Sequence, residues 1–81
     1  MFPQINRELD LRGFNEPIPV IKTHHAIDSL EDGDVLMVTT TDRGTLADLY
    51  AYCSQTGNIL LQSMEDAGEF TFLIRKHKQL N

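Results

Sequence analysis

Apolar and polar residues along the chain follow patterns that predict four strands. Leu9 and Leu11 alternate with charged residues, as in a half-buried strand, and the apolar run from Val35 to Val38 is typical of a central strand. Two later runs are separated by the turn-rich segment 64–68, which predicts a hairpin. The strands are therefore expected at about residues 7–11, 34–40, 58–63 and 69–75.

Helical spacing of apolar residues predicts a first helix from about Pro17 to Glu31, ended by Gly33. If residues are placed about 100° apart, one side of this helix forms the core face. The residues of that face are Val20, Thr23, Ala26, Ile27 and Leu30. Ile18 and Ile21 fall largely outside it, so they are either ordinary exposed residues or part of a surface that docks a partner.

A second helix is predicted from Thr45 to about Thr56, before Gly57. Thr45 and Asp48 have the spacing of a capping box, with Asp42 as the alternative cap. An i, i+3, i+4, i+7 stripe is expected to face the core, and it consists of Leu46, Leu49, Tyr50 and Cys53. Cys53 is therefore expected to be buried and unreactive.

This order of elements predicts an α/β two-layer sandwich of the α+β type. The order is β-α-β-α-β-β, and a right-handed crossover makes the first two strands parallel. We expect a mixed four-stranded sheet with both helices on one face. Residues 1–7 are expected to form a loose arm, 8–76 a single domain, and 77–81 a tail.

Two prolines indicate how the first helix begins. If Glu16 is the N-cap, Pro17 and Pro19 occupy the first and third helical positions, where no N–H group has an intrahelical acceptor. Residue 16 then lies at a helix N-terminus, where free N–H groups and the helix dipole favour an anion.

The segment from Leu9 to Pro19 resembles the signature of the TusA/SirA-like sulfur-carrier family. The residues that carry this resemblance are Leu9, Asp10, Gly13, Pro17 and Pro19, followed later by Gly33-Asp34, Thr41-Asp42, Gly57 and 72–76. The family has a sulfur-carrying cysteine where this chain has Glu16, so the segment is a variant of the Cys-Pro-x-Pro motif. Glu16 is either a natural divergence or an altered cysteine.

The resemblance implies a sulfurtransferase-like role in persulfide relay, with Glu16 at the catalytic position. It implies that this site is supported by Asp10, Gly13, Asn15, Pro17 and Pro19. The implied partners are a sulfur-donor protein, such as a cysteine desulfurase or a rhodanese, or a downstream sulfur acceptor, and no cofactor is implied. Because a carboxylate cannot form a persulfide, the chain should dock but not transfer sulfur, which leaves open whether it is an enzyme. Possible docking residues are Ile18, Ile21, Lys22 and His25.

The alternative function is a non-enzymatic regulatory or protein-binding module that keeps the fold. A net charge of -5 argues against general nucleic-acid binding, which depends on cationic contacts to phosphates. Lysines and arginines either form an ordinary solvated face or border one basic area beside residue 16; these are Lys22, Arg43, Arg75, Lys76 and Lys78.

The remaining chemistry-bearing residues give little support to other functions. The adjacent His24 and His25 point about 100° apart on a helix, so a shared metal is not expected. The single cysteine excludes an internal disulfide, and no stretch approaches the roughly 18 apolar residues of a membrane span. The opening residues also lack the pattern of a secretory signal, so a cytoplasmic location is expected.

Overall fold

The computed structural model describes residues 3–78, which form one sheet with two helices packed on it. In chain order the elements are β1 (Arg7–Leu11), α1 (Ile18–Asp28), β2 (Val35–Thr40), α2 (Thr45–Thr56), β3 (Ile59–Asp66) and β4 (Glu69–Arg75). The strands are ordered β1-β2-β4-β3 across the sheet; β1 and β2 are parallel and the other pairs are antiparallel. The predicted fold class is confirmed.

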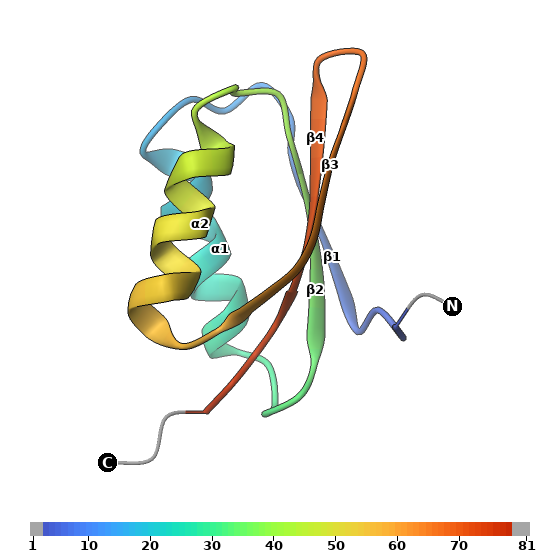
Figure 1. The fold of residues 1–81 in the computed structure, drawn as a ribbon, viewed down its shortest axis with the longest axis vertical. Helices are drawn as coiled ribbons and strands as arrows, with labels where there is room; N and C mark the ends of the chain where they lie inside the picture. The colour runs from blue at the N-terminus through green and yellow to red at the C-terminus, as the bar shows by residue number, and fades with distance from the viewer. Residues whose placement is uncertain (1–2, 79–81) are drawn as a thin grey trace.

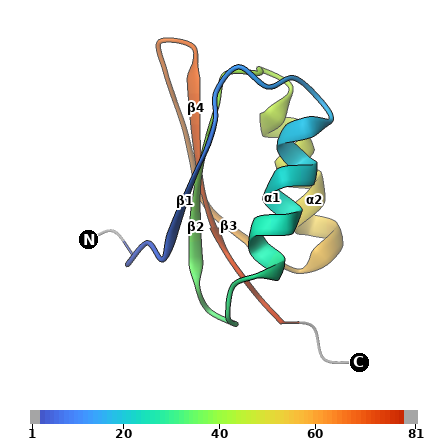
Figure 2. The same cartoon turned by 180° about the vertical axis from the view of Figure 1, so that it is seen from behind.

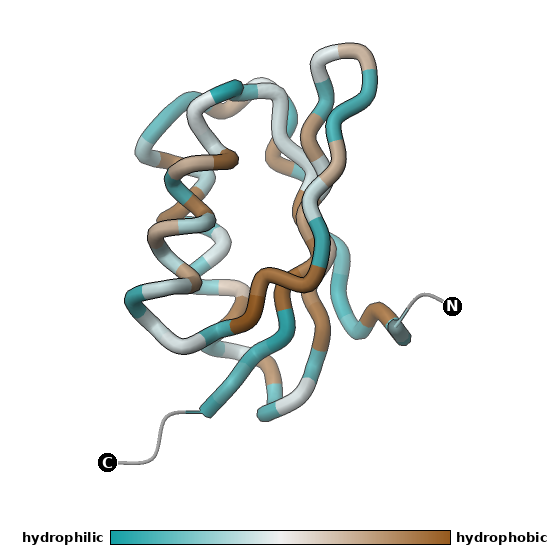
Figure 3. Tube along the Cα trace, viewed as in Figure 1, coloured by the Kyte–Doolittle hydropathy of each residue, from teal (hydrophilic) through white to brown (hydrophobic). Residues whose placement is uncertain are grey.

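Both helices lie on the same side of the sheet, and no described element covers its other side (Figures 1 and 2). The core lies between these two layers. Leu36 and Val38 of β2 and Ile74 of β4 are fully buried there, and Phe70 and Phe72 complete the inward face of β4. Apolar segments run along the central strands in Figure 3, as expected for strands buried under helices.

The first helix begins one residue later than predicted, because Pro17 is the N-cap of α1 and Glu16 lies outside it. Both prolines still lie at positions where an N–H group would have no intrahelical acceptor. The helix ends at Asp28 instead of Glu31. Its C-cap residue is Ser29, whose Oγ donates to the Ala26 carbonyl at 2.7 Å. Its core face was largely predicted: Thr23, Ala26 and Ile27 are buried, with Val20 and Leu30 partly buried beside them.

The second helix has the predicted bounds and the predicted Gly57 cap, but the prediction of its core-facing stripe was wrong. Leu49 and Cys53 are buried as expected, whereas Leu46 and Tyr50 are 45% and 67% exposed. The helix instead turns Thr45 and Tyr52 inward. Tyr52 can be buried because its hydroxyl has polar partners, His24 Nδ1 at 3.1 Å and Asn58 Nδ2 at 3.4 Å.

The hairpin between β3 and β4 is tighter than the sequence indicates. Both strands continue to a two-residue turn at Ala67 and Gly68, whose φ angles are 52° and 83°. Positive φ at both central residues is the condition for the turn that best matches the twist of a hairpin. Residues 64–66, expected in the turn, therefore belong to β3.

The chain just before β1 is held against β2. The Asn6 N–H group donates to the Val35 carbonyl at 2.9 Å, and Asn6 Oδ1 accepts from the Val35 N–H group at 2.8 Å. Within residues 3–78, neither helix is long and apolar enough to cross a membrane.

Candidate functional site

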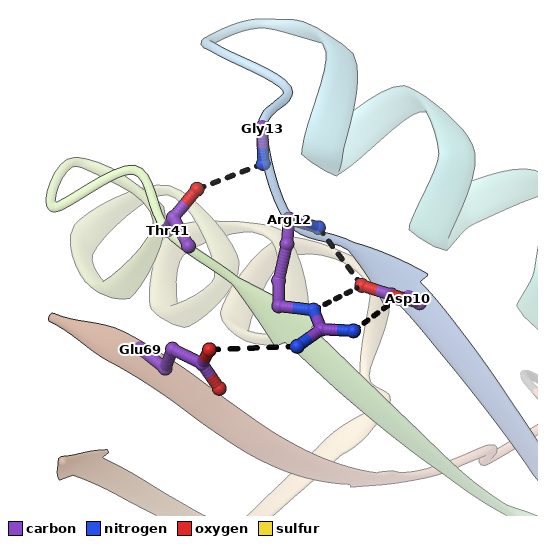
Figure 4. A network of polar contacts seen from close by, with 5 residues as sticks. All are labelled: Asp10, Arg12, Gly13, Thr41 and Glu69. Carbon is purple, nitrogen blue, oxygen red and sulfur yellow. Dashed lines mark hydrogen bonds and ion pairs between the residues drawn. The ribbon is translucent and has the colours of Figure 1, made fainter. Parts of the chain in front are cut away.

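The loop between β1 and α1 carries Glu16 and is tied to the loop between β2 and α2. The Gly13 N–H group donates to Thr41 Oγ1 at 2.8 Å, as Figure 4 shows, and Gly13 has a φ of 88° that a residue with a side chain rarely adopts. Further along, the Glu16 N–H group donates to Asp42 Oδ2 at 2.7 Å. Two contacts between distant parts of the sequence thus fix the backbone at residue 16.

Asp42 connects this loop to the start of α2. While its Oδ2 accepts from Glu16, its Oδ1 accepts from the N–H group of Gly44, the N-cap residue of α2, at 3.0 Å. These two hydrogen bonds lower the pKa of the Asp42 carboxyl group. The predicted capping box is wrong, because no side-chain cap bond forms at Gly44 and Thr45 is buried; Asp42, the alternative cap, makes the contact from outside the helix.

Glu16 was expected to cap α1, and this expectation was also wrong. The first N–H group of α1, at Ile18, donates to the Asn15 carbonyl at 3.0 Å, and no side chain makes a cap bond at the N-cap Pro17, which follows a cis peptide bond. The Glu16 carboxylate instead lies beside the first turn of α2. Its Oε2 is 3.4 Å from the point that a Cβ on Gly44 would occupy.

Two further carboxylates determine the electrostatics around Glu16. A side-chain hydrogen bond with Asp48 and repulsion from its charge raise the pKa of Glu16, and desolvation and the charge of Asp42 act in the same direction. The side chain is exposed beside a shallow groove between α1 and α2, whose lining comprises Glu16, Pro17, Val20, Asp48, Ala51, Tyr52 and Gln55. The sequence indicated Asp48 only as part of a cap, and it gave no signal for Gln55.

Asp10 lies on the other side of the sheet from this groove. Its carboxylate accepts two bonds from the Arg12 guanidinium, both at 2.9 Å, and Arg12 also reaches Glu69 on β4 at 3.5 Å (Figure 4). The bonds from Arg12 lower the pKa of Asp10 to about 2. Asp10 is therefore placed to hold the end of β1, from which the residue 16 loop departs, and does not touch Glu16.

The four possible docking residues share one exposed side of α1. Ile18 and Ile21 are 37% and 45% exposed, and Lys22 and His25 extend the same side by one more turn. The ammonium group of Lys22 lies 5.2 Å from the centre of the Phe14 ring, in a cation–π contact. His25 lines a shallow groove between α1 and β1.

The lysines and arginines noted in the sequence do not gather beside residue 16. Lys76 Nζ donates to the Leu30 carbonyl at 2.6 Å, and the Lys78 N–H group donates to Asp32 Oδ1 at 2.8 Å. These contacts lie beyond the C-terminal end of α1, whereas Glu16 precedes its N-terminal end. Of the five, Lys22 contacts Phe14 of the residue 16 loop, and Arg43 lies in the chain between Asp42 and Gly44, the two residues beside Glu16.

Cys53 is the only thiol of the chain, and its surroundings make it unreactive. The side chain is 5% exposed, and burial raises its pKa to about 11. A thiolate, the reactive form, is therefore rare at neutral pH. His24 is engaged with Tyr52, and among the described residues no group of three or more His, Cys, Asp or Glu side chains is arranged to hold a metal ion.

The chain has the same α/β fold as a SirA-like protein of known structure. A SirA-like protein from Desulfitobacterium hafniense superposes with a TM-score of 0.78 at 24% sequence identity, over 89% of this chain and 99% of that one.

Sequence comparison defines the family more closely. The profile of the family described as Sulfurtransferase TusA matches residues 7–76. The sulfur carrier protein TusA of Allochromatium vinosum is 41% identical over 71 residues, covering 88% of this chain and 93% of the relative. The sulfur carrier protein TusA of Pseudomonas putida is 43% identical over 68 residues, covering 84% and 85%. The chain belongs to the sulfurtransferase TusA family, which confirms the resemblance seen in the sequence.

The raised pKa of Glu16 leads to a testable pH dependence. Because an acid with a raised pKa is disfavoured in its ionised form, ionised Glu16 destabilises the fold, and this effect disappears as the pH falls through its pKa. Replacing Glu16→Gln should therefore raise the melting temperature at pH 7, and the gain should vanish at low pH. Thermal unfolding of both proteins from pH 3 to pH 8 measures the difference. A gain that is independent of pH would show that repulsion at this site is not its cause.

Proposed function

We propose that this chain is a sulfur-relay domain that docks a sulfur-donor protein but does not itself carry sulfur at residue 16. The donor would be a cysteine desulfurase or a rhodanese, and a downstream sulfur acceptor is the other possible partner. The observation that carries the proposal is the exposed position of Glu16, held between the first turns of α1 and α2 by Asp42. By its resemblance to the family motif, this is the position of the sulfur-carrying cysteine.

The chemistry of sulfur transfer requires a thiolate at this position. The carrier sulfur attacks the outer sulfur of the donor persulfide, so a new S–S bond forms on the carrier while the donor S–S bond breaks and the donor cysteine leaves as a thiolate. The carboxylate of Glu16 keeps the negative charge but has no sulfur atom to form that bond. Cys53 does not take over this role, because its thiol is buried in the core and a partner protein cannot reach it.

Docking is assigned to the exposed side of α1 next to Glu16. Two isoleucines give this side an apolar centre, and Lys22 and His25 give it a polar border, which is the usual composition of a transient protein interface. A regulatory protein-binding module would use the same surface without sulfur chemistry. Anion binding is not favoured, since Glu16, Asp42 and Asp48 already place three carboxylates at the site.

A cytoplasmic location is part of the proposal. Persulfide relay depends on cysteines that are not locked in disulfides, and the cytosol keeps thiols reduced.

The absence of sulfur transfer is tested with a persulfide-loaded donor and mass spectrometry of the intact chain. The unmodified protein should gain no sulfur, whereas Glu16→Cys should gain one sulfur atom. The carboxylate of Asp48 should hold the pKa of the new thiol up, so adding Asp48→Asn should lower that pKa and accelerate loading. One sulfur added to Cys53 of the natively folded, unmodified chain would refute the proposal.

Docking is tested with the substitution Ile21→Asp. Because Ile21 is exposed, the melting temperature should change little, while affinity for a cysteine desulfurase in a calorimetric titration should fall by about tenfold or more. Leu46→Asp is a matched control, since Leu46 is also 45% exposed on a helix but lies on α2. Equal affinities for the two variants and the unmodified chain would remove the docking surface from α1.

A further inference from the structure

The side of the domain formed by α2 and β3 exposes apolar residues that the core does not use. Leu46 and Tyr50 belong to the α2 stripe that the sequence indicated as buried, yet both are largely exposed. Ile59 and Met64 of the neighbouring strand β3 are 44% and 43% exposed, and their pairing with Arg75 and Thr71 places them on the face of the sheet away from the helices. We call this side, defined by these four residues, the β3 flank. Half of the large hydrophobic side chains that the described residues expose lie on it, and the remainder belong to the N-terminal segment, the residue 16 loop and α1.

The β3 flank contains a hollow between the start of α2 and the hairpin. Its volume is about 210 Å³, and its lining comprises Leu46, Ser63, Met64, Glu65, Phe70 and Phe72. The two phenylalanines are buried core residues of β4, while Leu46 and Met64 remain exposed at its sides. An apolar side chain entering this hollow would therefore continue the core of the domain.

β3 is also an edge strand. It pairs only with β4 in the sheet order β1-β2-β4-β3, so no described strand occupies its outer side. The pairing is irregular between Leu60 and Gln62 and regular from Gln62 to Asp66. The regular part is the part that borders the hollow. An edge of this kind offers unpaired backbone donors and acceptors to an extended partner.

The charges at the hairpin end of the β3 flank indicate what kind of segment would bind there. Glu65, Asp66 and Glu69 surround the hairpin turn, and the only ion pair that the described residues form with them is the contact of Arg12 with Glu69 at 3.5 Å. Among the described residues, no lysine or arginine lines the hollow. Asp66 and Glu69 face each other on the side of the sheet away from the helices, whereas Glu65 pairs with the buried Phe70 on the helix side. Positive side chains on the outer face of the incoming segment would therefore complement Asp66 and Glu69.

We propose that the edge of β3 binds an extended segment of another protein, in which apolar residues alternate with lysine or arginine. The segment adds to the sheet next to β3, with its apolar side chains toward Leu46 and Tyr50. Its cations lie on the other face of the sheet, within reach of Asp66. The alternation follows from the geometry of a strand, whose successive side chains point to opposite faces.

This surface is separate from the residue 16 groove. One side of α2 packs against α1, where the residue 16 groove lies, and the opposite side of α2 borders β3. A partner on the β3 flank therefore leaves Glu16 and the exposed side of α1 accessible. The inference does not depend on whether the chain takes part in sulfur relay.

The test is a nuclear magnetic resonance titration of the full chain with a peptide of alternating valine and lysine whose two termini are capped. Amide signals of Gln62 to Asp66 should shift, and their exchange with solvent should slow as new backbone hydrogen bonds form. A peptide with the same composition, but with valines and lysines in separate blocks, controls for net charge and should bind at least about tenfold more weakly.

Two variants with equal starting exposure make the test specific. Leu46→Lys should weaken binding of the alternating peptide by at least about tenfold, while Ile21→Lys, at the other 45% exposed helical position, should leave it unchanged. Equal binding of the two peptides, or shifts confined to α1 and the residue 16 loop, would overturn the proposal. Shifts that depend on protein concentration without peptide would also overturn it, because a second copy would then occupy the edge.

Discussion

The carboxylate of Asp42 is the interaction on which the arrangement of this site depends. One oxygen accepts a hydrogen bond from the N–H group of Glu16 and the other accepts one from the N–H group of Gly44, so a single side chain joins the loop before α1 to the N-cap residue of α2. The parallel pairing of β1 with β2 brings both loops to the same end of the sheet. Asp42 then converts that proximity into a defined position for residue 16.

This arrangement changes how the charge at residue 16 is interpreted. A helix N-terminus by itself favours an anion, which is why the sequence predicts a place for negative chemistry there. In the structure the N–H groups nearest to Glu16 already bond to Asp42 and to Asn15, and Asp48 contributes another carboxylate. Asp48, desolvation and the charge of Asp42 raise the pKa of Glu16, so its ionised form is disfavoured. The site therefore holds its carboxylate at some cost in stability.

Sequence reasoning succeeded where local patterns decide the structure. The strand alternation at Leu9 and Leu11, the two prolines and Gly57 each act over a few residues, and the elements they predict are present with small shifts of their ends. Local patterns could not predict the core face of α2. Leu49 and Cys53 can be buried together either with Leu46 and Tyr50 or with Thr45 and Tyr52, and periodicity alone does not choose between these two faces. The choice is made by the partners of Tyr52 on α1 and beyond α2.

The direction of the Glu16 side chain was equally beyond local patterns. It depends on Asp42 and Asp48, which lie 26 and 32 residues further along the chain and approach only once β1 and β2 have paired. The sequence placed the residue at a helix start and identified its family motif. It could not show which of two helix starts the carboxylate would face, since that depends on how the helices pack.

Hydrogen exchange at the Glu16 and Gly44 amides tests the role of Asp42 most directly. In Asp42→Ala both amides lose their acceptor, so their exchange should accelerate while amides of the β2–β4 pairing stay protected. Asp42→Asn, which retains one acceptor oxygen, should give an intermediate effect. If the Glu16 amide in Asp42→Ala remains as protected as in the unmodified chain, Asp42 does not hold residue 16 in place.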